Sequence, residues 1–483
     1  MIRKTVSLVS LAALSACSLA PKYVRPELPV PPSWPVGDAY LTQSEATLPS
    51  IGFRDIFRDL RLQRIVAQAL VNNRDLRVAA ANIAIARAQY RIQRAELLPE
   101  VAASAGFTRR DSGTGGTTTN GTSSGGATSA FSTSLGITAF EVDLFGRVRS
   151  LTTAAQNRYF ENEAAARATR LTLVGDIATA WLTYASDQSL LKIARDTAAS
   201  AERSVTLTRM RLDGGVAPRT DLAQAQIIQQ TALSDLATQT TLVAQDGNAL
   251  QLLVGAPVDL ALLPASIEEA APTVAELPAG LNSNILLRRP DVVQAEYELR
   301  AANAEIGAAR AALFPTISLT ALAGLASSSL GNLFTGGAFN YSIAPSASYP
   351  IFRAGAGRAG VVQSQAQRDS ALATYEKTIQ TAFREVSDAL ARRGTITAQL
   401  NAQRALTAAS SDNYRLSDAR YRGGIDTFLQ SLDAQRSLYS AQRTLVTTRL
   451  TGATNLVTLY RTLGGDATLE TTPAGPREMS PAR

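Results

Sequence analysis

The sequence predicts a mainly helical chain with a smaller β-strand contribution, built as two copies of one unit. A glycine pair between long helical patterns, Gly214-Gly215, returns 209 positions later as Gly423-Gly424, and Arg211 then superposes on Arg420. A glycine pair between two helical patterns is typical of a tight helix-helix turn. Alternating strand patterns precede each hairpin at a similar offset. Several landmarks in the same order therefore indicate an internal duplication.

The composition removes most catalytic chemistry. The 483 residues include no His and one Cys, and the formal net charge of +7 is carried almost wholly by arginines that alternate with acidic residues. Ser-His and Cys-His nucleophiles, imidazole metal sites and internal disulfides are thereby excluded. We expect no enzymatic activity, no cofactor and no bound metal. Without a basic run or an aromatic ladder we also expect no nucleic-acid partner.

The N-terminus has the basic start and short apolar run of an export signal, which is too short to span a membrane. The tetrad Leu14-Ser15-Ala16-Cys17 resembles a bacterial lipobox, which implies that Cys17 becomes the lipidated first residue. Ser18 in the next position implies, by the same resemblance, sorting to the outer membrane. The alternative is a chance buried cysteine in an ordinary signal. A single lipid anchors a protein without making it span the bilayer.

The remaining divisions follow from proline content and periodicity. We expect a signal peptide at 1–16, an extended strap at 17–50, a first repeat at 51–254, a linker at 255–288, a second repeat at 289–464 and a disordered tail at 465–483. The first repeat should contain one helix from 51 to about 96, strands at 101–110 and 131–144, and a hairpin tip at 214–215. The second should contain strands at 316–326 and 339–352 and a tip at 423–424.

The strands indicate membrane insertion. Phe339, Tyr341 and Ile343 alternate with small polar residues, and the segments have about the 9–11 residues that a tilted membrane strand needs. The alternative is a half-buried strand of a soluble sandwich. Four strands cannot close a barrel, and lipid does not tolerate open sheet edges. The chain should therefore oligomerise, and barrels of eight, twelve or sixteen strands would satisfy this argument.

Three motifs resemble those of TolC-type outer membrane factors, in the lipidated NodT-like branch of efflux channels. They are FEVDLFGRVR at 140–149, LPAGLNSNILLRRPDVVQAE at 277–296 and RYRGGIDTFLQSLDAQRSL at 420–438. The resemblance implies a homotrimer with a 12-stranded barrel that continues into a periplasmic helical tunnel. It further implies a passive duct in the outer membrane lipid, served by a periplasmic adaptor and an inner-membrane pump of the resistance-nodulation-division type.

The resemblance also assigns candidate site residues. It places the closed periplasmic gate at Leu429, Asp433 and Arg436, whereas the first copy has Gln224 and Ile227 at the positions that match the two charges. The alternative is a solvated helical ion pair. Adaptor docking is assigned to the tip residues Gly214, Gly215, Val216, Gly423, Gly424 and Ile425. Two further functions stay open: the outer membrane channel of a type I secretion system, and a lipidated periplasmic coiled-coil scaffold.

Overall fold

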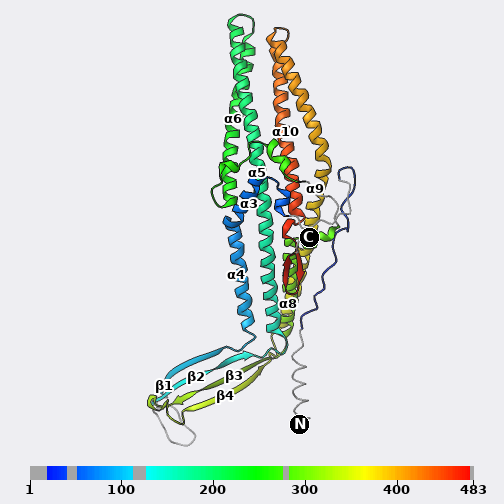
Figure 1. Cartoon of the computed structure of the whole chain (residues 1–483). Coiled ribbons are helices and arrows are strands. Elements are labelled where there is room, and N and C mark those ends of the chain that lie inside the picture. The colour runs from blue at the N-terminus through cyan, green and yellow to red at the C-terminus, as the bar shows by residue number, and fades with distance from the viewer. Residues whose placement is uncertain (1–18, 41–51, 112–126, 276–281, 479–483) are drawn as a thin grey trace. The chain divides into compact units, whose positions relative to one another are not determined.

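The computed structural model describes residues 19–40, 52–111, 127–275 and 282–478 (Figure 1). Cys17 and the expected signal peptide lie outside the described residues. The chain divides into two compact units, which are described separately. The first comprises Met1–Pro26, Ala84–Glu161 and Glu296–Thr374, and the second comprises Glu27–Ile83, Asn162–Ala295 and Tyr375–Arg483.

The first unit contains an antiparallel four-stranded sheet of order β1-β2-β3-β4. Its strands are β1 Val101–Asp111, β2 Ala127–Glu141, β3 Thr316–Ser327 and β4 Phe339–Ser348. Strand β2 begins and ends earlier than the expected 131–144, and β4 ends before 352. A bulge between Ile137 and Phe140 shifts the register of β2, and Ala139 within it has φ of 52°. The bulge moves Phe140 onto the face that Ile137 occupies, which the simple alternation did not predict.

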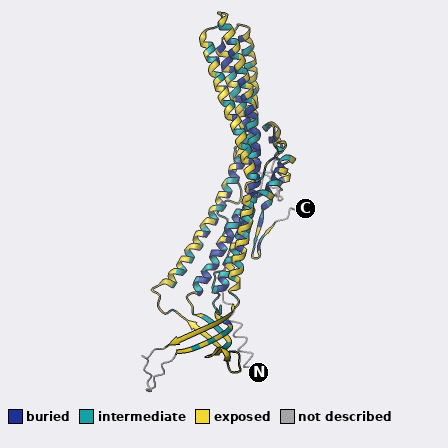
Figure 2. Cartoon of the chain, turned by 90° about the vertical axis from the view of Figure 1, so that its left-hand side faces the viewer, coloured by how far each residue is buried: buried dark blue, intermediate teal, exposed yellow. Residues whose placement is uncertain are grey.

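The sheet has one apolar and one small polar face. Phe107 pairs with Phe131, with ring centroids 4.7 Å apart, and Tyr341 pairs with Ala323. On the opposite face the hydroxyls of Ser104 and Ser134 lie 2.8 Å apart. The outer strands β1 and β4 are exposed along their whole lengths (Figure 2). In the described part of the chain, each pairs with a strand on one side only.

In the described part of the chain, six longer helices contain most of the residues. They are α4 Arg74–Ala95, α5 Arg147–Asp213, α6 Arg219–Val254, α8 Pro290–Ala311, α9 Ala356–Arg422 and α10 Phe428–Thr462. Helices α5 and α6 form one hairpin, and α9 and α10 form the other (Figure 1). Within the described segments, no helix combines the length and the apolar character required to cross a membrane.

The single helix expected from 51 to about 96 is wrong. The structure has three helices there: α2 Phe53–Ile56, α3 Leu60–Asn72 and α4. The Asp59 side chain caps α3 by accepting from the Arg61 amide, and the Asn73 carboxamide accepts from the amide of Leu76 while it donates to Leu253 of α6 at 2.8 Å. These side-chain bonds offer the backbone an alternative to a continuous helix.

The second unit is packed from small residues and a few large anchors. Ala198 and Ala201 of α5 pack against Ala232 of α6, so the helices approach closely. Further from the tips, Trp181 is fully buried, and its indole N–H donates to the Leu262 carbonyl at 3.1 Å. That bond ties α5 to the segment after α6, where the structure has η2 Leu260–Leu262, α7 Ile267–Ala270, η3 Ala271–Thr273 and η4 Ser283–Arg288.

The expected disordered tail also differs from the structure. Strands β5 Leu469–Thr472 and β6 Gly475–Glu478 form an antiparallel hairpin. Leu469 is fully buried, and the Arg170 guanidinium binds the Asp466 carboxylate at 2.8 Å. A buried side chain and an ion pair thus anchor a segment whose own sequence is rich in turn residues.

Candidate functional site at the hairpin tips

Each helical hairpin turns through a Schellman motif. In the first, Gly215 has φ of 74° and the Val216 amide donates to the Arg211 carbonyl at 2.9 Å. Gly424 repeats this geometry in the second, with φ of 73° and the corresponding bond at 2.9 Å. Glycine adopts this left-handed conformation without the steric cost of a Cβ, and the bond satisfies a helix-terminal carbonyl. The two glycine pairs thus lie at the turns.

The equivalent arginines of the two tips have different partners. The Arg211 guanidinium lies 4.7 Å from the ring centroid of Tyr421 and donates to its carbonyl at 2.9 Å, so it joins the first hairpin to the second. Arg420 instead binds Asp426 within its own tip at 2.5 Å. The hydrogen bond from Arg420 holds the pKa of the Asp426 carboxyl below its usual range.

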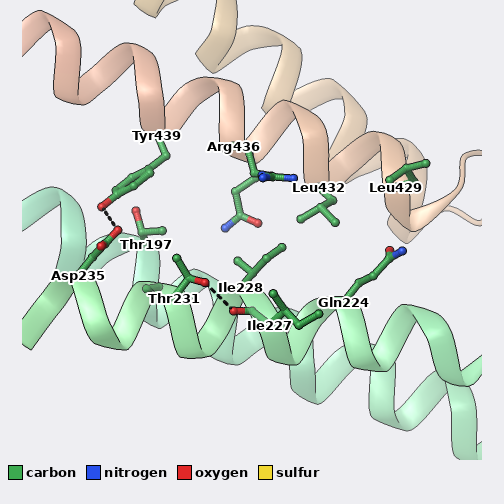
Figure 3. Close-up of a pocket in the computed structure, with 12 residues that line it drawn as sticks. Thr197, Gln224, Ile227, Ile228, Thr231, Asp235, Leu429, Leu432, Arg436 and Tyr439 are labelled. Atoms are coloured by element: carbon green, nitrogen blue, oxygen red, sulfur yellow. Dashed lines mark hydrogen bonds between the residues drawn. The ribbon is translucent and has the colours of Figure 1, made fainter.

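A cavity of about 400 Å³ lies between the two hairpins near the tips (Figure 3). Helix α6 contributes Gln224, Ile227 and Asp235, and α10 contributes Leu429, Leu432, Arg436 and Tyr439. Beside it, Val205, Ala225, Tyr421, Phe428 and Leu432 form a buried apolar cluster from all four helices. The cavity therefore combines an apolar wall with a few polar side chains.

One hydrogen bond links the hairpins across this cavity. The Tyr439 hydroxyl of α10 donates to the Asp235 carboxylate of α6 at 2.8 Å (Figure 3). Burial, together with that neighbouring carboxylate, raises the pKa of Tyr439 to about 12. The phenol therefore stays protonated and keeps its donor role throughout the physiological range.

The structure brings two of the three predicted gate residues to the cavity. Leu429 and Arg436 line it, whereas Asp433 is exposed and is not part of the lining. Among the residues that the structure describes, neither Asp433 nor Arg436 forms an ion pair within 4.0 Å. The tip side chains Val216 and Ile425 are both about two-thirds exposed.

The sequence reasoning missed Asp235 and Tyr439. At the offset of 209, Asp235 matches Thr444 and Tyr439 matches Gln230. Each of these polar residues is thus present in only one copy, which is the same signal that singled out Asp433 and Arg436. A complete comparison of the copies would have identified the pair as candidates.

The sheet has one apolar face, as expected of a membrane strand, and the chain also has two packed helical hairpins. Comparisons with known proteins identify the class of protein. The profile of the family "Outer membrane efflux protein" matches residues 65–256 and 281–465. The chain therefore belongs to the outer membrane efflux protein family.

Individual relatives cover nearly the whole chain. The chain is 48% identical to the probable efflux pump outer membrane protein TtgC of Pseudomonas putida, with 95% of this chain and 96% of the relative covered. It is 39% identical to outer membrane protein OprJ of Pseudomonas aeruginosa, with 95% of each chain covered.

Solved structures give the same assignment. The open-state MtrE outer membrane channel of Neisseria gonorrhoeae superposes with a TM-score of 0.82 at 34% identity, covering 93% of this chain and 98% of that one. The predicted fold class, family and outer membrane location are thus confirmed.

Proposed function

We propose that this chain is the passive exit duct of a tripartite efflux system. An inner-membrane pump of the resistance-nodulation-division type passes its substrates through a periplasmic adaptor into this channel, which releases them outside the outer membrane. The sheet is the observation that carries the proposal. Its apolar face suits lipid, but within the described residues β1 and β4 each have one unpaired edge, and such edges require other strands to close them.

The closing strands come from two further copies of the chain. Three copies supply twelve strands, which is within the size range of known outer membrane barrels. Helix α4 supports association because Val78, Ile85 and Ile92, spaced by seven residues, are all more than half exposed. A heptad stripe of this kind normally packs against another helix. In the trimer, α4 of one copy covers a helix of the next.

The cargo is inferred from the relatives, whose names refer to toluene, solvent and antibiotic efflux pumps. Small toxic organic compounds are therefore the proposed substrates, and antibiotic resistance is the proposed consequence. The chain contributes a passage and no catalytic step.

The proposed gate is on α10 beside the cavity between the hairpins, which Leu429 and Arg436 line and Asp433 does not. Leu429, Asp433 and Arg436 converge around the trimer axis and close the periplasmic mouth. The Tyr439–Asp235 bond holds the second hairpin against the first within each chain, so separation of the hairpins would break it. The exposed tips, with Val216 and Ile425, dock the adaptor.

Lipid attachment at Cys17 completes the proposal. The acyl chains assist delivery, and the barrel supplies stable insertion. Mass spectrometry of the mature protein should find an acylated Cys17 at its N-terminus. An unmodified Cys17 within an intact signal would refute this part and leave the duct unaffected.

The duct itself is tested by measuring oligomer mass and single-channel conductance on one detergent-extracted sample. We expect the mass of three chains and stable conductance. Ile85→Arg should abolish both, because three buried guanidiniums would face apolar side chains, whereas a change at the exposed Arg415 to Gln should abolish neither. A monomer, or a trimer without conductance, would support the scaffold alternative.

A further inference from the structure

A second cavity in the helical unit is rich in arginine. It has a volume of about 520 Å³ and lies between the segment that contains α7 and η3 and the helices α9 and α10. Four guanidinium groups line it, from Arg58, Arg393, Arg404 and Arg449. They come from separate parts of the chain: Arg58 follows α2, Arg393 and Arg404 belong to α9, and Arg449 belongs to α10. Tertiary folding therefore gathers them.

Among the described residues that line the cavity, Glu268 is the only acidic one. Its carboxylate binds Arg449 and accepts from the Ser189 hydroxyl at 3.0 Å. Arg58 and Arg404 are exposed, and neither makes an ion pair with any other residue in the described ranges. Two guanidiniums at the cavity, those of Arg58 and Arg404, thus have no carboxylate partner among the described residues, and they favour an anion.

The floor of the cavity is apolar. Ile267 is fully buried, and Val274 and Leu456 are nearly so. The backbone of Arg58 is held in place because its amide donates to the Thr273 carbonyl at 2.9 Å beside the bridge between Phe57 and Val274. The site therefore combines a preformed apolar floor with cationic groups at its margin, and its volume is in the range of small-molecule pockets.

We propose that this cavity binds a small organic anion, a carboxylate or a phosphate monoester attached to an apolar body. Guanidinium groups present paired N–H donors that match the oxygens of either group. The apolar body occupies the floor, and the anionic group lies between Arg58 and Arg404. The bound anion thereby links the segment after α6 to both helices of the second hairpin. This site is separate from the tip cavity and does not depend on the gate.

Binding is tested with the full-length protein in a neutral detergent. The probes are 1-naphthyl phosphate and 1-naphthoate, and the controls are neutral 1-naphthol and inorganic phosphate. Equilibrium dialysis should show saturable binding of both aromatic anions that weakens with added salt. Naphthol should bind at least about tenfold more weakly because it lacks the charge-assisted bonds. The melting temperature should rise with the concentration of either anion.

Arg404→Gln should weaken binding of 1-naphthyl phosphate by about tenfold, whereas Arg404→Lys should retain part of it. The matched control is Arg415→Gln, which removes the same charge from an exposed position of the same helix, where Arg415 binds Asp412. Unchanged melting temperatures of the ligand-free variants would confirm that folding is intact. No saturable binding, equal binding of naphthol, or equal loss in the Arg415 control would overturn the proposal.

The anion could be a membrane lipid phosphate or a soluble organic acid. A titration with short-chain phosphatidic acid below its critical micelle concentration distinguishes them. Tighter binding than 1-naphthyl phosphate would assign the site to lipid, and weaker binding would assign it to soluble organic anions.

Discussion

The two hairpin tips share a backbone and differ in what their arginines bind. Arg420 finds Asp426 within its own turn, whereas the matching position in the first copy is Ala217, which has no carboxylate. Arg211 therefore reaches across to Tyr421 of the other hairpin. The comparison shows how a duplicated unit diverges: glycines that fix the turn are kept, and side chains that decide the partner change. The tip that has the carboxylate forms a local ion pair, and the tip that lacks it forms a contact between repeats.

The sheet offers the test with the largest expected effect. Leu135 from the first copy and Tyr341 from the second both pair with Ala323, so they lie at the same height on the same face of the sheet. If both copies contribute to one lipid-facing surface, Leu135→Arg and Tyr341→Arg should each lower the free energy of unfolding by about 2–4 kcal/mol near mid-bilayer. Guanidinium titration of the protein folded into lipid vesicles measures this loss. Ser342→Arg, on the opposite face, should cost far less, and an equal loss there would remove the lipid-facing assignment.

At the hairpin turns, the two copies should respond alike to substitution. Gly215→Ala and Gly424→Ala should each lower the free energy of unfolding by about 1–2 kcal/mol, because alanine disfavours the left-handed conformation. A Cβ at either position meets nothing within 4 Å, so the cost is one of backbone conformation. Thermal unfolding followed by circular dichroism gives the comparison. Gly247→Ala is the control: it lies inside α6 with open space around it, and it should stabilise by about 0.5–1 kcal/mol. A cost at only one tip would contradict their structural equivalence.

The first helical hairpin has a pair of acidic residues that the second hairpin lacks. The carboxyl groups of Asp187 in α5 and Asp246 in α6 interact, and burial together with the Asp187 charge raises the pKa of Asp246 to about 7. The matching residues of the second copy are Ile396 and Asn455, and Asn455 donates to the Ala389 carbonyl at 3.0 Å. The first copy thus has a titratable pair where the second has none.

The sign of the resulting pH dependence follows from the raised pKa. The folded protein retains a proton on Asp246 that the unfolded chain releases near pH 4, so stability falls as the pH rises from about 4 to about 7. Asp246→Asn, the residue of the second copy, should remove this slope and stabilise the protein above pH 7. Because the pair is partly exposed, solvent screening limits the gain to about 1 kcal/mol. Melting temperatures at pH 5 and pH 8 measure it, with Asp196→Asn at an exposed position of α5 as the control. A variant as pH-dependent as the parent protein would exclude the pair as the cause.

The duplication, the glycine turns and the strand faces could be predicted because each has a local pattern in the sequence. The break at Asn73 could not, because its side chain contacts Leu253, 180 residues away. The tail hairpin likewise depends on Leu469 being buried and on Arg170 reaching Asp466. At the candidate site, the residues at the turns could be predicted. The Tyr439–Asp235 bond could not, because the sequence of one helix does not determine which side chains of another helix will face it.

The smallest effect on stability is expected at the proposed gate. Asp433 and Arg436 are exposed and make no ion pair with another described residue of their own chain, so Asp433→Ala combined with Arg436→Ala should change the unfolding free energy of a chain by less than about 1 kcal/mol. In the proposed trimer, however, three such sets would face each other around one axis. Three weak pairs lost together shift an open-closed equilibrium by roughly 1–3 kcal/mol, and each 1.4 kcal/mol is about tenfold in population.

The double variant should therefore raise single-channel conductance and admit large antibiotics while melting at nearly the parent temperature. Gln224→Ala, at the first-copy position that matches Asp433, should do far less. Conductance that is unchanged in the double variant, or raised equally by the Gln224 control, would assign both charges to a solvated helix surface.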